Sequence, residues 1–164
     1  MKLVVLADTH IRTPSGRRRL PDAVYAELAT ADAILHAGDV LVADVIHELG
    51  GFAPTYAVLG NNDDSQLAAM LPETRVEVLA GVRVGMIHDS GPTAGRAARM
   101  RGRFPDCDLV VYGHSHVPFD GPGLEGQWLL NPGSPIERRA QPHHTFGVVE
   151  LDGGAIVRTA IREC

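Results

Sequence analysis

The feature of this sequence that most constrains its fold is a series of short apolar runs, rich in β-branched residues. Runs of about four to eight such residues are typical of buried β-strands. They cover residues 2–7, 33–36, 55–59, 82–87 and 109–112. Stretches with helical spacing of apolar residues separate the early runs, at residues 22–31, 42–49 and 65–71. Strands that alternate with helices predict parallel pairing and an α/β layer fold.

The second half of the chain follows a different pattern. Its expected elements are a β-hairpin, a helix with a basic face and three further strands, at residues 75–87, 93–103, 127–130, 146–151 and 155–161. The Gly-Pro-Gly segment at residues 121–123 predicts a loop. No linker or repeat interrupts the chain, so the sequence predicts a single domain over residues 1–164.

The composition is that of ordinary globular proteins, with 45% hydrophobic and 21% charged residues. A net charge of −5 argues against a general nucleic-acid coat protein. No apolar stretch approaches the roughly 18 residues that span a membrane, and Asp8 and His10 come too early for a signal peptide. Cys107 and Cys164 make no disulfide framework. We therefore expect a cytoplasmic protein for which neither membranes nor nucleic acids are the partners.

Each of the five apolar runs is followed by residues that can bind a metal ion. These segments are Asp8-Thr9-His10, Gly38-Asp39, Gly60-Asn61-Asn62-Asp63, His88-Asp89 and Gly113-His114-Ser115-His116. In α/β sheets, sites form in the crevice at the carboxyl ends of the strands. A single Asp-x-His or His-x-His pair arises easily by chance and alone indicates a cap or a surface residue, but the ordered set of five does not. We expect the five segments to converge on one site.

The residue types favour a particular kind of metal site. Carboxylate and amide oxygens with imidazole nitrogens, and no cysteine, suit Mn²⁺, Fe²⁺, Co²⁺, Ni²⁺ or Zn²⁺ better than Ca²⁺. Seven candidate ligands are too many for one tetrahedral ion but suit two ions that share a carboxylate. Two ions about 3.5–4 Å apart form the arrangement that clamps the attacking and leaving oxygens in phosphoryl displacement.

The order of these motifs resembles that of calcineurin-like metallophosphoesterases. The resemblance runs from Asp8 to about Arg138 and covers most of the chain. The segments "HAGD" (36–39), "GHSH" (113–116) and "NPGS" (131–134) are similar to the small, single-domain prokaryotic phosphodiesterase branch. This resemblance implies an α/β (α+β) fold, a four-layer αββα sandwich in which helices flank two facing mixed β-sheets, with a dinuclear site at the sheet edge.

The resemblance also implies a role for each matching residue. The expected ligands of a first ion are Asp8, His10 and His116, and those of a second ion are Asn61, His88 and His114. Asp39 is expected to bridge the two ions, and Asp63 to orient a neighbouring ligand. The cofactors are expected to be two divalent transition-metal ions, with Mn²⁺ favoured and Ni²⁺, Fe²⁺, Zn²⁺ or Co²⁺ as alternatives.

The implied reaction is hydrolysis of a small phosphoester, most simply a phosphodiester, by in-line attack of a metal-bridging hydroxide. Asn61, Asn62, Asp63 and His88 are expected to take part in catalysis. Many family members have His where this chain has Asn62, and the small bacterial branch often has Cys. Asn donates a hydrogen bond but is no general acid near neutral pH. Alkoxide leaving groups should therefore react slowly, and acidic leaving groups faster. Asp89 also stands where the family usually has Gly.

Alternatives to this function stay open at the level of sequence. In the family the same centre hydrolyses phosphomonoesters and nucleotide pyrophosphates. A different class is a non-catalytic metal-binding interaction scaffold, because the retromer subunit in vacuolar sorting resembles this fold and has a degraded site. The seven competent ligand positions argue for catalysis. A homodimer through the C-terminal strands is a further alternative to a monomer.

Arginines near the expected site allow two interpretations. Arg17-Arg18-Arg19 follow the first ligand segment and predict a solvated loop, with phosphate binding as the alternative. Arg138-Arg139 fit either interpretation equally. Arg96, Arg99, Arg101 and Arg103 are expected to form a solvated helix face. Together these residues would form a basic rim that steers anionic substrates.

Overall fold

The computed structural model describes residues 1–12 and 19–164, and this part of the chain forms four helices and ten strands. The helices are α1 (Asp22–Leu28), α2 (Ala43–Gly50), α3 (Ser65–Met70) and α4 (Arg96–Arg103). The first five strands are β1 (Lys2–Leu6), β2 (Ala33–His36), β3 (Thr55–Ala57), β4 (Thr74–Leu79) and β5 (Val82–Ile87). The others are β6 (Leu109–Val111), β7 (Phe119–Pro122), β8 (Trp128–Asn131), β9 (Thr145–Asp152) and β10 (Ala155–Glu163).

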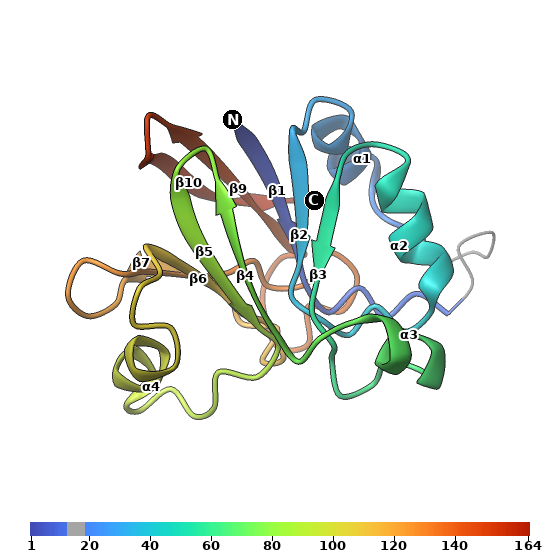
Figure 1. The fold of residues 1–164 in the computed structure, drawn as a ribbon. Helices are drawn as coiled ribbons and strands as arrows, with labels where there is room; N and C mark the ends of the chain where they lie inside the picture. Colours follow the sequence, from blue (N-terminus) through green and yellow to red (C-terminus); the bar gives the residue numbers. More distant parts are fainter. Residues whose placement is uncertain (13–18) are drawn as a thin grey trace.

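The strands form two mixed sheets of five strands each, in the orders β10-β9-β1-β2-β3 and β4-β5-β6-β8-β7. The sheets face each other, with α1, α2 and α3 beside the first sheet and α4 beside the second (Figure 1). The predicted sandwich of two facing mixed sheets flanked by helices is confirmed.

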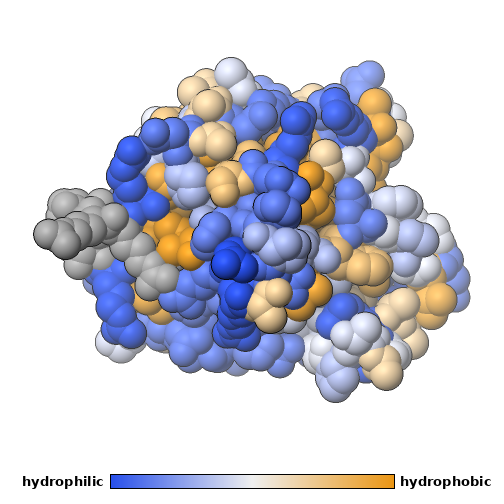
Figure 2. All heavy atoms as spheres, turned by 180° about the vertical axis from the view of Figure 1, so that it is seen from behind, coloured by the Kyte–Doolittle hydropathy of each residue, from blue (hydrophilic) through white to orange (hydrophobic). Residues whose placement is uncertain are grey.

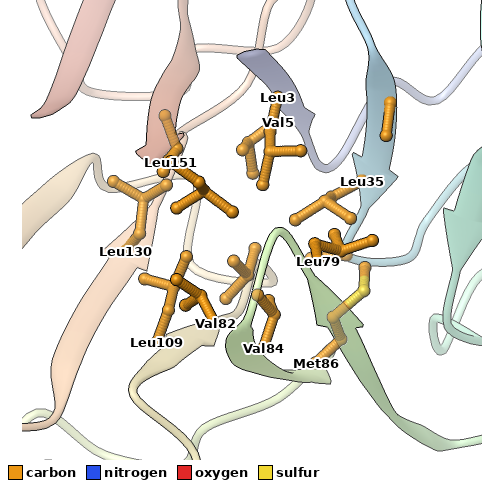
Figure 3. Packing of buried hydrophobic residues seen from close by; sticks show 14 of the residues in the cluster. Leu3, Val5, Leu35, Leu79, Val82, Val84, Met86, Leu109, Leu130 and Leu151 are labelled. Carbon is orange, nitrogen blue, oxygen red and sulfur yellow. The ribbon is translucent and has the colours of Figure 1, made fainter. Parts of the chain in front are cut away.

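The continuous apolar character of β1 follows from burial on both faces of its sheet. Leu3 and Val5 point between the sheets, where they pack with Leu35, Val84 and other aliphatic side chains (Figure 3). The intervening residues of β1 point to the opposite face and pack against Val24 of α1 and other helix residues. Because successive side chains of a strand alternate between faces, one apolar run serves two layers of core.

Several expected elements differ from the structure in their bounds, and three of the differences have a clear local cause. The Gly-Pro-Gly segment is not a plain loop, because Gly121 and Pro122 belong to β7. Proline lacks a backbone N–H, and β7 tolerates it because it is an edge strand. The basic helix begins at Arg96, three residues later than expected, directly after Gly95 with its positive φ of 73°. The C-terminal strand extends to Glu163, two residues further than expected, because β10 pairs with β9 along almost its whole length.

The topology brings the carboxyl ends of several strands to one edge of the sandwich. Strands β1, β2 and β3 are parallel in the first sheet, and β5, β6 and β8 are parallel in the second. The segments that follow β1, β2, β3, β5 and β6 gather at the lower edge in Figure 1. These are the segments that carry the predicted ligands.

The surface is mainly hydrophilic on the face shown in Figure 2, with hydrophobic side chains scattered in small groups. None of the helices in residues 1–12 and 19–164 has the length and apolar character needed to cross a membrane.

Candidate metal centre

The first group of predicted ligands comes together from segments that are far apart in the sequence. His116 Nε2 lies 3.3 Å from Asp8 Oδ1 and 3.4 Å from His10 Nε2. The three side chains offer ligand atoms that all lie within 4.8 Å of one another, which is the spacing of groups that can share one metal ion. The first apolar run and the fifth, more than 100 residues apart, therefore build one group.

A second group forms from the segments that follow β3, β5 and β6. Asn61 Oδ1 lies 3.0 Å from His88 Nε2 and 2.9 Å from His114 Nδ1. The two imidazole nitrogens are 3.3 Å apart. Three side chains from three segments thus direct an oxygen and two nitrogens at one point.

Asp39 lies between the two groups. Its Oδ2 is 3.5 Å from His10 Nε2 of the first group, and its Oδ1 is 3.5 Å from His88 Nε2 of the second. Its carboxylate is 1% exposed. One buried carboxylate that presents one oxygen to each group has the geometry required of a bridge between two ions.

The burial and the pKa values of Asp8 and Asp39 are those of carboxylates that a bound cation would stabilise. Asp8 is fully buried, and neither of its carboxylate oxygens has a hydrogen-bond partner in the described part of the chain. Burial raises the pKa of Asp8 to about 7. Burial also opposes ionisation of Asp39, but hydrogen bonds from His88 and Asn62 outweigh it and lower the pKa of Asp39 below its ordinary value. An ionised, buried carboxylate that accepts no hydrogen bond is costly unless a positively charged group or a metal ion compensates its charge.

Backbone carbonyls orient two of the imidazoles. The Nδ1–H of His88 donates to the Ala37 carbonyl at 2.7 Å, and the Nδ1–H of His116 donates to the Glu137 carbonyl. When the ring is neutral, this contact leaves an Nε2 lone pair that faces the site, whereas the protonated ring directs an Nε2–H there, as in the contact of His88 with Asp39. Contacts of this kind hold metal-binding histidines in the correct tautomer.

Five of the seven predicted ligands have a left-handed backbone conformation. They are Asp8, His10, Asp39, His114 and His116, with φ between 48° and 67°. This conformation is uncommon for residues other than Gly and costs about 1 kcal/mol or more per residue. Strain of this kind persists where the surrounding structure holds it, and it clusters at functional sites.

Two glycines of the motifs let the backbone approach the ligands closely. A Cβ on Gly60 would lie 2.3 Å from Asp39 Oδ1, and a Cβ on Gly38 would lie 2.7 Å from His88 Nδ1. Gly38 also has a φ of 87°. The Gly residues in "HAGD" and in the segment after β3 are therefore required by packing against the ligands.

Asp63 and Asn62 support the site through hydrogen bonds. Asp63 accepts one bond from the Gly60 N–H at 2.7 Å and another from the Leu41 N–H at 2.8 Å. It thereby ties the segment of Asn61 to that of Asp39. Asn62 is exposed and donates from its side-chain amide to Asp39 Oδ2 at 2.7 Å.

The structure gives specific contacts to Ser134, Asn131 and His36, which stand in the motifs "NPGS" and "HAGD" but were not among the predicted site residues. Ser134 of "NPGS" donates to the Asp8 carbonyl at 2.7 Å, and Asn131 donates to the Gly113 carbonyl at 3.0 Å. The motif therefore fastens the first and last ligand segments together. Buried His36 lies 3.1 Å from Thr9 Oγ1, and burial lowers the pKa of His36 to about 3, which keeps it neutral. In the sequence, the feature that indicated Asn131 and Ser134 is that the motif Asn-Pro-Gly-Ser directly follows an expected strand.

The predicted arginines differ in position. Arg17 and Arg18 lie outside the described residues, and Arg19 pairs with Asp22 at the start of α1. Arg138 bonds back to the Gln141 carbonyl of its own turn. Arg139 lies beside the site, where its charge helps to lower the pKa of Asp8 against the effect of burial. Of the pair at 138–139, only Arg139 is therefore close to the ligands.

Comparison with known proteins agrees with this geometry. Residues 1–154 match the calcineurin-like phosphoesterase superfamily domain. The chain belongs to this superfamily. It is similar to a "probable metallophosphoesterase" of Methanothermobacter thermautotrophicus, with 34% identity over all of this chain and 96% of the relative. A second "probable metallophosphoesterase", from Methanocaldococcus jannaschii, is 33% identical over 85% of this chain and 70% of the relative.

Among solved structures, vacuolar protein sorting 29 from Cryptosporidium parvum has the same fold as this superfamily member, with a TM-score of 0.79. The match covers 99% of this chain and 97% of the other at 22% identity.

Several hollows of similar size, about 350–400 Å³, lie on the described surface, and two of them bear on the position of the site. One of about 370 Å³ is bordered by Asn61, His88 and His114, and so opens directly at the second ligand group. The other, about 400 Å³, lies near Trp128 and Val157 at the opposite ends of the strands and has none of the predicted ligands in its walls. The first hollow is the one that can hold a group bound at the centre.

Proposed function

We propose that this protein is a metal-dependent phosphoesterase that hydrolyses small phosphodiesters at a dinuclear centre. The observation that supports it most is the position of Asp39, with one oxygen toward each of two groups of donor atoms. Such an arrangement is what two ions sharing a carboxylate require. The superfamily and the names of the two archaeal relatives support the same class of reaction.

In this proposal the first ion is held by Asp8, His10 and His116, the second by Asn61, His88 and His114, and Asp39 binds both. The donor atoms are oxygens and nitrogens, which favours Mn²⁺, with Ni²⁺, Fe²⁺, Zn²⁺ and Co²⁺ as alternatives. When bound, the ions supply Lewis-acid activation of water and neutralise charge on the phosphate.

The protein's own residues contribute position and charge. The buried Asp8 and Asp39 carboxylates provide the negative charge that retains two cations. The carbonyl contacts of His88 and His116 keep their Nε2 atoms directed inward. Asp63 holds the segment of Asn61 against that of Asp39. The donors are therefore ordered before a substrate binds, which lowers the cost of organising the site.

Asn62 is proposed to donate a hydrogen bond to the phosphate. Its side chain is exposed and reaches Asp39 Oδ2, so a rotation of the amide suffices to direct it at a substrate oxygen. Because an amide supplies no proton near neutral pH, the leaving group must depart as the anion or be protonated by water.

The absence of an acid at position 62 predicts a steep dependence of rate on the leaving group. For aryl and alkyl diesters of graded leaving-group pKa, kcat should fall as that pKa rises. The Asn62→His variant should recover about tenfold or more on the alkyl esters alone. Steady-state kinetics on the series checks this. Equal rates across the series, with chemistry shown to limit them, would contradict the assignment.

The experiment that tests the function is a metal-reconstituted screen. Protein loaded with Mn²⁺, Ni²⁺, Zn²⁺ or Fe²⁺ is offered aryl diesters, monoesters and cyclic nucleotides. Diesters should be hydrolysed fastest. The Asn61→Ala and His88→Ala variants should each lose about a hundredfold or more in kcat while they keep the circular dichroism spectrum and cooperative unfolding of the parent. Faster hydrolysis of monoesters or pyrophosphates would point to those activities instead.

The likeness in fold to vacuolar protein sorting 29 favours one alternative of another class, a non-catalytic metal-binding scaffold. At 22% identity that likeness concerns the fold alone. The competent residues at all seven ligand positions support catalysis over this alternative. Metal-loaded protein that binds two ions but turns over no phosphoester would favour the scaffold.

A further inference from the structure

The four arginines of α4 do not form the uniformly solvated face that the sequence suggests. Arg96 stacks its guanidinium over the Tyr112 ring, 4.9 Å from the centroid. Arg99 donates to the carbonyls of Ala94 and Ser90 in the preceding loop. Arg101 pairs with Glu125 at 2.9 Å. Three of the four are therefore used to hold α4 and its neighbouring loops in place.

Arg103 is the exception. In the described part of the chain it forms no ion pair or hydrogen bond between side chains, and it lies at the last residue of α4. It borders the hollow of about 370 Å³ that opens at His88 and His114. An exposed guanidinium without a partner at the edge of a phosphoester site is available to bind a substrate.

The rest of this hollow has a mixed character. Glu73 and Asp89 contribute carboxylates, and Thr74 contributes a hydroxyl. Leu59 and Ile87 contribute aliphatic surface. The described lining includes no Phe, Tyr or Trp. Among the described residues, Arg103 forms no ion pair with either acidic residue, and of the Asp89 oxygens Oδ1 already accepts from the Gly91 N–H. The guanidinium, the Glu73 carboxylate and Asp89 Oδ2 therefore remain available to a ligand.

These donors and acceptors restrict the chemistry of the occupant. A second anionic group would satisfy Arg103 but would face Glu73 and Asp89. A cationic group would satisfy the carboxylates but would face Arg103. A group with several hydroxyls satisfies all three, because a hydroxyl both donates to a carboxylate and accepts from a guanidinium. The aliphatic walls suit the C–H faces of such a group, and the described lining offers no Phe, Tyr or Trp ring for base stacking.

We propose that this hollow binds one ester group of the substrate and that this group is hydroxylated and non-aromatic, such as a sugar ring. The proposal rests on the proposed function, because the hollow receives an ester group only if the phosphate of the substrate binds at the metal centre beside it. It specifies the substrate class as sugar or polyol phosphodiesters.

The test measures binding with ligands that cannot be hydrolysed. The probes are the phosphonate analogues of glucose 1-phosphate and phenyl phosphate, in which a methylene replaces the ester oxygen, and methylphosphonate. Calorimetry on the Mn²⁺-loaded protein should give a Kd for the glucose analogue about tenfold or more below that for methylphosphonate. The phenyl analogue should bind no better than methylphosphonate within about threefold.

Variants distinguish a specific subsite from general attraction. Arg103→Ala and Glu73→Gln should each remove most of the preference for the glucose analogue. Arg101→Ala, the matched control two residues away on the same helix, should keep it. Preferential binding of the phenyl analogue, binding of none of the probes, or an unchanged preference in Arg103→Ala would overturn the inference.

Hydrolysis of bis(4-nitrophenyl) phosphate, measured on the same samples, reports on the proposed function separately. Turnover of this ester without a preference for the glucose analogue would refute the sugar subsite alone. A preference that depends on Arg103 without turnover of any ester would support the subsite and refute the hydrolytic function.

Discussion

Replacing Asp39 by Asn is expected to reduce kcat for phosphodiester hydrolysis by about a thousandfold or more. Asp39 presents one oxygen to each of the two donor groups, at 3.5 Å from an imidazole nitrogen in both cases. Asn has the same shape but offers one oxygen, and its NH₂ group would face either an imidazole nitrogen or the amide of Asn62. The variant therefore loses both the bridging charge and the second contact.

The same variant should also lose bound metal. After desalting, inductively coupled plasma mass spectrometry should find clearly fewer than two ions per chain, whereas the parent protein retains both. Asp44→Asn provides the matched control, because Asp44 is exposed in the first turn of α2, away from the ligands. It should keep full activity and metal content. An Asp39→Asn protein that held two ions and worked within about tenfold of the parent would refute the bridging role.

The second large effect concerns the stability of the metal-free protein. Asp8 has a pKa of about 7 in the folded chain against 3.8 as its ordinary value. The folded state therefore binds more protons than the unfolded state between these values, and the free energy of unfolding falls as the pH rises through this window. Ionised Asp8 then costs up to about 4 kcal/mol, since each pKa unit corresponds to about 1.4 kcal/mol.

The Asp8→Asn variant should isolate this cost. It should have stability similar to that of the parent near pH 4 and should become progressively more stable than the parent up to about pH 7, with no further change above that. Urea unfolding of both proteins in the presence of a chelator measures the difference. Other groups that titrate, such as His36, are present in both proteins and largely cancel. A difference that did not vary between pH 4 and pH 8 would contradict an energetic cost of ionising this buried carboxylate.

Bound metal should make the parent protein more stable than Asp8→Asn, which is the reverse of the order expected without metal. If Asp8 binds a cation, its charge becomes favourable, so Mn²⁺ should raise the melting temperature of the parent at pH 8 and have a smaller effect on Asp8→Asn. Asp44→Asn should respond to metal as the parent does. These results together would show that the Asp8 carboxylate contributes to metal binding and is not required for the stability of the fold.

Much of the fold could be predicted from the sequence because its strands are short, apolar and buried. All five early apolar runs form strands, at β1, β2, β3, β5 and β6. The ligand segments could be located as well, because they directly follow these strands and the carboxyl ends of parallel strands meet at one edge. Strand β7 could not be predicted, because Gly121 and Pro122 favour a turn locally and only pairing with β8 makes them extended.

The sequence by itself determined which residue types reach the edge of the sandwich and in what order they follow the strands. The family resemblance implied how they are grouped, but only the tertiary structure decided how close they lie, because the distance between His10 and His116 or between Asp39 and His88 depends on strand order across two sheets. It also decided that Arg101 pairs with Glu125 while Arg103 borders the hollow. Local patterns depend on neighbours along the chain, whereas a site depends on distances between segments that are far apart in the sequence.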